Sequence, residues 1–208
     1  MKLIVGLGNK GQEYTGTRHN VGFKIVNSLP LVAATLSDTD TDTRQDSSKW
    51  KVKKDAAYWE GSVGGQKIVV IKPQTYMNVS GGVVANYVHN LKINPKEDLW
   101  VIHDDLDLPI GVFKIQKNVS AAGHNGVKSI IEKIGHQDFI RFRFGIGRPT
   151  DQTPIDKYVL QKMDSRTPEQ LLVRDARLEC AKAILYALKH GIVDAMNRYN
   201  VKNQNSAS

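Results

Sequence analysis

Short apolar runs alternate along the chain with stretches in which apolar residues recur every three or four positions. A continuous apolar run predicts a buried strand, alternation of apolar with polar residues predicts a half-exposed strand, and a spacing of three to four predicts a helix. By these patterns strands lie at 2–8, in a hairpin over 56–73, and at 97–105, 111–117 and 140–147, and helices lie at 20–29, 80–91, 124–135 and 168–190. Strands that alternate with helices indicate a single α/β domain.

The length and composition of the chain fit one domain with two polar appendages. The chain has 208 residues, of which 40% are hydrophobic, enough to form one core. We expect the domain to span 1–200, with a flexible surface insertion at 37–49 and a polar C-terminal tail at 201–208.

The sequence predicts neither export nor insertion into a membrane. No apolar run approaches the roughly 20 residues that a membrane span needs. Residues 1–8 already have the pattern of a core strand, so we expect no signal or transit segment. The single cysteine, Cys180, excludes an internal disulfide and a cysteine-rich metal site and suits a reducing compartment. We therefore expect a cytoplasmic or mitochondrial protein.

The charge of the chain favours a polyanionic partner. Lysine and arginine number 29 against 21 for aspartate and glutamate, which gives a net charge of +8. Such an excess is typical of proteins that bind nucleic acid, although it also fits a basic surface without a dedicated partner.

The segment GLGNKG at 6–11 matches the glycine fingerprint of dinucleotide-binding folds. That fingerprint requires a helix that begins at its last glycine and an acidic residue about 20 positions later. Here Gly16 and Gly22 interrupt the expected helix, and the first acidic residue after Glu13 is Asp38. A nicotinamide-dependent oxidoreductase is therefore the weaker hypothesis. We interpret the glycines as a tight turn that leaves room for a ligand at the end of a strand.

Polar side chains gather where the predicted strands end, in a combination that suits hydrolysis. These residues are Asn9, Asn78 and Asn125, Asp104, Asp105 and Asp107, and His19 and His124. A carboxylate can orient an imidazole, the imidazole can take a proton from water, and neutral amides can hold a substrate carbonyl. The structural alternative is that Asn9 satisfies turn amides and His19 caps the following helix.

Several motifs make the chain resemble the bacterial-type peptidyl-tRNA hydrolases. They are GLGNKG followed by Tyr14, TRHNVG, MNVSGG, HDDLDLPIG, GHNGVKSI and FRFGIGRP, in the order of that family. The resemblance implies one globular domain with a twisted mixed β-sheet surrounded by helices, active as a monomer without metal or cofactor. It also implies hydrolysis of the ester bond between the peptide and the 3′ end of the tRNA in peptidyl-tRNA.

The same motifs imply roles for individual residues. By its place in TRHNVG, His19 is expected to be the general base that activates water, and Asp104, in HDDLDLP, to orient it. Asn9 is expected beside the base and the water, Asn78 at the peptide backbone, and Asn125 at the water or the peptide carbonyl. The further substrate-binding residues that the resemblance implies are Tyr14, Met77 and His124.

A group of basic residues in the half of the chain that holds Asn125 is a candidate for contacts with the acceptor stem and phosphate backbone of tRNA. We expect the phosphate on Lys114, Lys117 or Arg143, and the sequence leaves open which lysine takes part. For each of these residues the alternative is a solvated surface position.

A few departures and further residues complete the sequence-based interpretation. Lys10 stands where the family has proline, so we expect looser geometry around Asn9. His103 is expected on the face of its strand opposite Asp104. No GxSxG, HExxH or CxxC segment occurs, which argues against the hydrolases and metal sites that carry them. A non-catalytic RNA-binding module is the third hypothesis.

Overall fold

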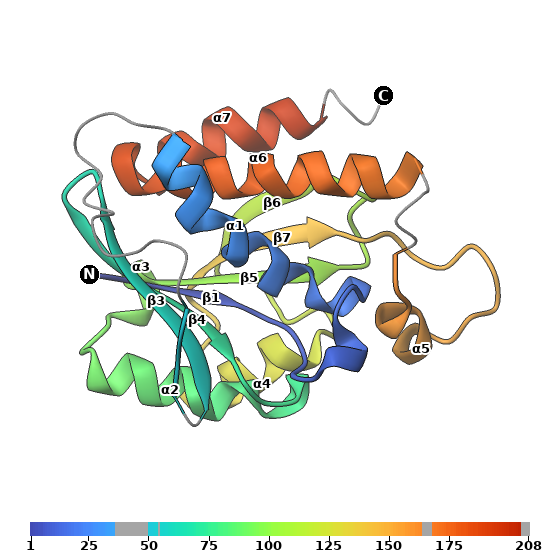
Figure 1. Ribbon diagram of the computed structural model, residues 1–208, viewed down its shortest axis with the longest axis horizontal. Helices are drawn as coiled ribbons and strands as arrows, with labels where there is room; N and C mark the ends of the chain where they lie inside the picture. Colours follow the sequence, from blue (N-terminus) through green and yellow to red (C-terminus); the bar gives the residue numbers. More distant parts are fainter. Residues whose placement is uncertain (36–49, 54, 164–167, 205–208) are drawn as a thin grey trace.

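The computed structural model describes residues 1–35, 50–53, 55–163 and 168–204, which form a mixed β-sheet between two layers of helices (Figure 1). Within these residues the strand order is β2-β3-β4-β1-β5-β7-β6. The strands are β1 Lys2–Gly6, β2 Lys51–Val52, β3 Ala56–Val63, β4 Gln66–Pro73, β5 Leu99–Asp105, β6 Phe113–Lys117 and β7 Ile140–Gly145. The four central strands β4, β1, β5 and β7 are parallel, so their carboxyl ends meet at one edge of the sheet.

Helices cover both faces of the sheet. One layer consists of α1 Val21–Thr35, α6 Pro168–His190 and α7 Ile192–Gln204, and the other of α2 Ser80–Asn90 and α4 Asn125–Ile134 (Figure 1). Short helical segments lie in the connections: η1 Gln12–Tyr14, η2 Arg18–Asn20, η3 Met77–Val79, α3 Pro95–Asp98 and α5 Ile155–Leu160.

Strand β5 is buried along its whole length and contributes to two apolar cores. Trp100 and Ile102 pack with side chains of α1 and α6, whereas Leu99 and Val101 pack with side chains of α2 and α4. This burial on both faces explains the continuous apolar run that predicts the strand. It also places the polar end of β5 between the two helical layers.

The start of α1 lies directly against the ends of β1 and β5. The backbone N–H of Leu7 donates to the carbonyl oxygen of Ile102 at 2.9 Å, and that of Phe23 donates to Leu7 at 3.1 Å. A Cβ at Gly22 would lie 2.5 Å from the oxygen of Ile102, so only glycine fits at this crossing. The close approach holds the preceding segment, which contains His19, over the end of β5.

The predicted α/β class and mixed sheet are confirmed, and so is the hairpin, whose Gly64 and Gly65 have φ of 56° and 72°. Three α-helices were not predicted: α3, whose last two residues fall in the strand predicted at 97–105, α5, and α7 beyond Gly191. Because α7 runs to Gln204, the first four residues of the predicted tail at 201–208 are helical. The predicted insertion at 37–49 lies outside the described residues. No helix in the described parts of the chain is both long and apolar enough to cross a membrane.

Candidate active site

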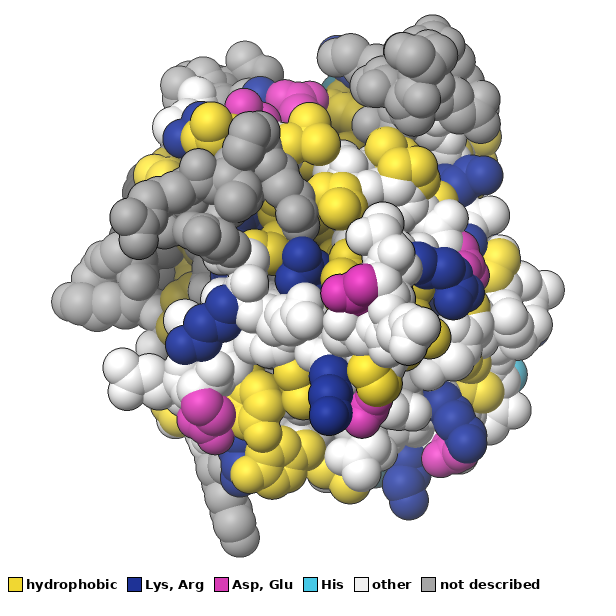
Figure 2. Space-filling model, turned by 90° about the vertical axis from the view of Figure 1, so that its right-hand side faces the viewer, with side chains coloured by type: hydrophobic (Ala, Val, Ile, Leu, Met, Phe, Trp, Pro, Cys, Tyr) yellow, Lys and Arg dark blue, Asp and Glu magenta, His cyan; other side chains and the backbone are white. Residues whose placement is uncertain are grey.

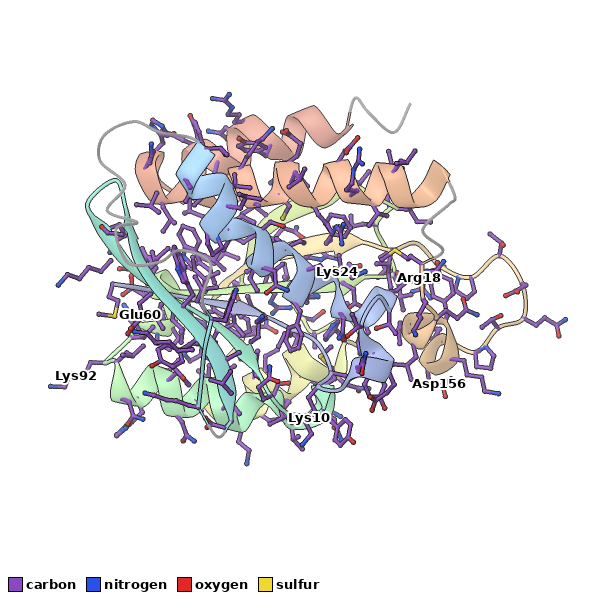
Figure 3. The ribbon with its side chains drawn as sticks, in the orientation of Figure 1. Lys10, Arg18, Lys24, Glu60, Lys92 and Asp156 are labelled. Carbon is purple, nitrogen blue, oxygen red and sulfur yellow. The ribbon has the colours of Figure 1, made fainter. Side chains whose placement is uncertain are left out.

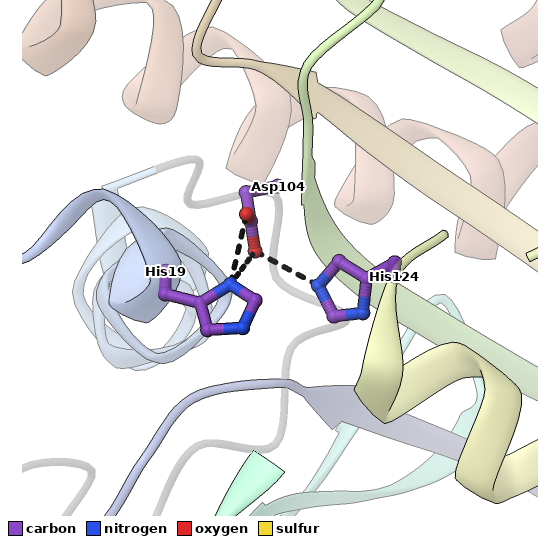
Figure 4. Close-up of side chains that lie close together, drawn as sticks. All are labelled: His19, Asp104 and His124. Atoms are coloured by element: carbon purple, nitrogen blue, oxygen red, sulfur yellow. Dashed lines mark hydrogen bonds and ion pairs between the residues drawn. The ribbon is translucent and has the colours of Figure 1, made fainter. Parts of the chain in front are cut away.

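Three side chains from separate parts of the chain meet at the carboxyl end of β5 (Figure 4). His19 lies in η2, Asp104 is the penultimate residue of β5, and His124 directly precedes α4. Nδ1 of His19 lies 2.9 Å from each carboxylate oxygen of Asp104, and Nε2 of His124 lies 2.9 Å from Oδ1. The expected contact between His19 and Asp104, 85 positions apart, is therefore present.

The hydrogen bonds of His124 define which of its nitrogens carries the proton. Its Nδ1 accepts from the backbone N–H groups of Gly126 at 3.1 Å and Val127 at 3.2 Å, where it caps α4. Nε2 therefore carries the proton and donates it to Asp104. Protein groups therefore bind both ring nitrogens, and the expected contact of His124 with a substrate stays a prediction.

The carboxylate of Asp104 is an ionised group in a buried position. Burial alone would raise its pKa, but the imidazoles of His19 and His124 outweigh burial and hold the pKa of Asp104 well below its ordinary value. An anion at this point orients Nδ1–H of His19 toward itself. Nε2 of His19 is then the nitrogen with a free lone pair.

His103 lies next to this cluster although its side chain is on the other face of β5, the face of Leu99 and Val101. Its Nδ1 donates to the backbone oxygen of Asp104 at 2.7 Å, and its ring lies 4.8 Å from the ring of His124. Burial, reinforced by His124, lowers the pKa of His103 well below its usual value. His103 is therefore a neutral neighbour of the cluster.

The nitrogen and oxygen atoms of the cluster are arranged as hydrogen-bond partners. One candidate set of metal ligands among the described residues is His19, Asp104 and His124, whose ligand atoms all lie within 4.8 Å of one another. The separations of 2.9 Å between nitrogen and oxygen are those of direct hydrogen bonds.

A cavity of about 300 Å³ opens beside the cluster and offers space for a reacting group. Asn125 and the cluster form its polar side, and Leu106, Ile155 and Val159 form an apolar wall. Two of these apolar residues belong to α5, which sequence reasoning missed. Ile155 is 47% exposed, so the wall continues onto the surface.

Asn9 is held by a buried amide network at the end of β1. Its Oδ1 accepts from the backbone N–H of Met77 at 2.7 Å. Asn20 binds the backbone of Asn9 on both sides, because its Oδ1 accepts from the N–H of Asn9 at 2.8 Å and its Nδ2 donates to the oxygen of Asn9 at 3.0 Å. Sequence reasoning missed Asn20, although it directly follows His19 in TRHNVG. Its distance from Asn9 in the sequence corresponds to no regular period that could have indicated the contact.

The other residues expected to bind substrate lie around this network with different exposures. Asn78 is exposed on η3, and Asn125 is exposed at the first position of α4. Tyr14 is half-buried, with its ring edge-on to that of Tyr76 at 6.3 Å. The side chain of Met77 is buried in the core beneath α2 and α4, so only its backbone belongs to the polar network.

Lys114 and Arg143 occupy paired positions on β6 and β7, close to the end of the sheet that carries His19, Asp104 and His124. On its other side, β7 pairs with β5, and there Arg143 lies opposite His103. Its Nε donates to Asp105 at 2.6 Å, and its Nη1 donates to the side-chain oxygen of Gln116. The carboxylate of Asp105 therefore offsets part of the positive charge of this guanidinium.

The structure separates Lys117 from the other two expected phosphate ligands. Lys117 pairs with Ile140, the first residue of β7, and its Nζ lies 3.8 Å from Asp138 at the opposite end of the parallel strands. Three positions along β6 thus carry Lys117 to the far edge of the sheet, away from Lys114 and Arg143, and its contact with a tRNA phosphate stays a prediction. Arg141, two positions before Arg143 on β7, is 1% exposed and donates to the backbone oxygens of Val119 and Ser120.

The segment after GLGNKG differs from a dinucleotide-binding site. The chain continues from Gly11 into η1 and η2, and α1 begins only at Val21. The α-helix that the dinucleotide fingerprint requires at its last glycine is therefore replaced by a short helical turn, η1, which argues against the oxidoreductase hypothesis.

Comparison with known proteins identifies the family. The family model described as peptidyl-tRNA hydrolase matches residues 3–207. Peptidyl-tRNA hydrolase of Shouchella clausii is 41% identical over 200 residues, covering 96% of this chain and 100% of the relative, and that of Fervidobacterium nodosum is 42% identical over 199 residues, covering 95% of each. The crystal structure of peptidyl-tRNA hydrolase from Acinetobacter baumannii is 32% identical, with a TM-score of 0.81 and coverage of 96% of this chain and 94% of that one. The chain therefore belongs to the peptidyl-tRNA hydrolase family of enzymes.

Proposed function

We propose that this chain hydrolyses the ester bond between the peptide and the 3′ end of tRNA, with His19 as the general base. The observation that carries the proposal is the 2.9 Å contact of Nδ1 of His19 with the ionised Asp104, at the border of a cavity. Because Nδ1 donates to the carboxylate, Nε2 keeps a lone pair that can accept a proton from water.

The reaction needs no protein nucleophile. The water oxygen forms a bond to the ester carbonyl carbon while Nε2 of His19 takes the proton that the water releases. The bond between that carbon and the ribose oxygen then breaks, and the leaving oxygen receives the proton from His19. A general base of this kind contributes about 10²–10⁴ in rate.

Carboxamides position the water and the peptide in this proposal. Asn125, which lines the cavity at the start of α4, is assigned to the water or the peptide carbonyl. Asn9 has its Oδ1 bound by Met77, so its Nδ2 is the atom offered beside the base. Asn78 and Tyr14 are assigned to the peptide.

We assign Lys114 and Arg143 to the phosphate backbone of the acceptor stem. Their support is the net charge of +8 and their position near the catalytic end of the sheet. Figure 2 turns this end toward the viewer, and it carries lysine and arginine side chains among exposed apolar ones. Contacts with phosphates make binding sensitive to salt and largely independent of base sequence. We propose a monomer, located in the cytoplasm or the mitochondrion.

A hydrolysis assay on N-acetylated aminoacyl-tRNA tests the function, with the unblocked aminoacyl-tRNA as control. We expect release of N-acetyl amino acid from the first substrate and slow release from the second. Binding of tRNA without turnover would instead support an RNA-binding module. Calorimetric binding of NADH would support the oxidoreductase.

A further inference from the structure

The carboxylate of Asp104 serves two imidazoles, and only one of them can act as a base. Oδ1 accepts from His124 at 2.9 Å, while both oxygens lie 2.9 Å from Nδ1 of His19. The ring of His124 has no free nitrogen, because Gly126 and Val127 donate to its Nδ1. His124 therefore cannot take a proton from water itself, and it acts through the two groups that it binds, Asp104 and the start of α4.

We propose that His124 is a positioning residue that shares the Asp104 carboxylate with His19 and thereby sets the pH above which His19 works as a base. This inference rests on the proposed role of His19. It assigns His124 to the acid–base machinery, whereas the family motifs suggested that it binds substrate.

The physical basis is competition for one negative charge. A hydrogen bond to a charged group is about twice as strong as one between neutral groups. The carboxylate also stabilises the positive charge that His19 carries after it takes a proton. A second donor on Oδ1 draws part of the charge away from His19, so protonated His19 is held less tightly than it would be by an unshared carboxylate. With His124 in place, His19 is free of its proton at a lower pH.

The second effect is geometric. His124 caps α4, the helix whose first residue is Asn125, and binds Asp104 at the end of β5. The same imidazole therefore links the carboxylate that orients the base with the helix that carries a proposed substrate amide.

The other charged and titratable groups near His19 leave this argument intact. His103 is on β5 and is held neutral by burial. Asp156 lines the cavity from α5. Arg18 lies on η2, and its guanidinium is 4.4 Å from the ring of Tyr158. Figure 3 labels Asp156 and Arg18 at the same end of the molecule. Among the described residues, His19 and His124 provide hydrogen bonds to Oδ1 of Asp104.

Two substitutions separate the electrostatic role of His124 from its structural one. His124→Asn keeps a side-chain oxygen that can cap α4, since asparagine is a favoured N-cap, but its shorter side chain ends before Asp104. His124→Phe keeps the ring and fills the space but has neither the cap nor the donor. His89→Asn, at an exposed position of α2, is the matched control.

The measurement is kcat/KM on N-acetylated aminoacyl-tRNA between pH 5 and pH 9, together with the NMR titration of the His19 ring. We expect the acidic limb of the profile, and the ring titration, to move to higher pH by about 0.5–1 unit in both His124 variants, which lowers kcat/KM on that limb about three- to tenfold. His89→Asn should leave the limb in place. Only His124→Phe should also lower the melting temperature, because it alone loses the cap.

An acidic limb that stays in place, or moves to lower pH, in both folded variants would overturn the proposal. A different result would show that the proposed role of His19 as the general base is wrong. If His19→Asn keeps wild-type turnover, His19 is not the base. If His19→Asn is inactive and the limb of the His124 variants does not move, only the proposed role of His124 is wrong.

Discussion

Replacing Asp104 by asparagine removes a negative charge from the centre of the site with little change in volume. The carboxamide offers one oxygen as acceptor and one NH₂ group as donor. His124 must keep its proton on Nε2, because backbone N–H groups of α4 bind its Nδ1, so the amide oxygen remains opposite His124. The NH₂ group then faces His19, which accepts at Nδ1 and carries its own proton on Nε2. In this tautomer Nε2 cannot take a proton from water.

The size of the effect follows from the base that the variant loses. A general base contributes about 10²–10⁴ in rate, so kcat should fall by about that factor. At 1.36 kcal/mol for each factor of ten, this is about 2.7–5.4 kcal/mol of transition-state stabilisation. Affinity for tRNA should change less than twofold, since the proposed phosphate contacts lie on β6 and β7.

The assay is single-turnover cleavage of N-acetylated aminoacyl-tRNA at saturating enzyme, with circular dichroism to confirm the fold. Asp107→Asn is the control, because Asp107 lies three positions after Asp104, in the turn that follows β5, and is exposed and paired with Arg148. It should cleave within twofold of the wild-type rate. A folded Asp104→Asn variant that cleaves within fivefold of wild type would refute the reasoning about the tautomer.

Three further predictions test the packing, the proposed tRNA contacts and the buried histidine. Gly81→Ala should destabilise the fold by several kcal/mol, because its Cβ would overlap the backbone of α4. Gly82→Ala, whose Cβ would have nothing within 4 Å, should be neutral or stabilise α2 by up to about 1 kcal/mol. Urea unfolding of the two variants distinguishes these outcomes. Arg143→Gln should weaken tRNA binding and reduce the slope of the logarithm of the binding constant against the logarithm of salt concentration by about 0.7–0.9. An unchanged slope would remove Arg143 from the phosphate contact. Lys117→Gln, at the far end of the sheet, should leave the slope unchanged. Because burial lowers the pKa of His103, the unfolded chain takes up a proton near pH 6.5 that the folded chain does not, so the unfolding free energy falls below that pH by up to about 1.4 kcal/mol per unit. His103→Asn keeps a donor for the backbone oxygen of Asp104, and its unfolding free energy should fall less between pH 7.5 and 5.5; equal losses would contradict the account.

The strands of the sheet can be predicted from the sequence, because they depend on local patterns. Continuous apolar runs mark β1 and β5, and the polar residues at their ends fall at the same edge since the strands are parallel. The pair of Gly64 and Gly65 marks the hairpin turn. The contact between His19 and Asp104, 85 positions apart, was instead expected from the resemblance of TRHNVG and HDDLDLP to the motifs of the family.

What the sequence could not predict depends on tertiary contacts without a local period. The six residues of α5 carry no long apolar stripe, yet Ile155 and Val159 form the wall of the cavity. The locked tautomer of His124 results from its position at the start of α4 and beside Asp104. The separation of Lys114 from Lys117 depends on how β6 is aligned with β7, which the basic residues themselves do not encode.

The most direct test of the central claim is single-turnover cleavage of N-acetylated aminoacyl-tRNA by His19→Asn, at enzyme concentrations that saturate the substrate. If water is activated by the imidazole that Asp104 orients, the rate falls at least about 100-fold while tRNA affinity stays within twofold of wild type. A folded variant that binds tRNA and cleaves it within a few-fold of the wild-type rate would contradict the account.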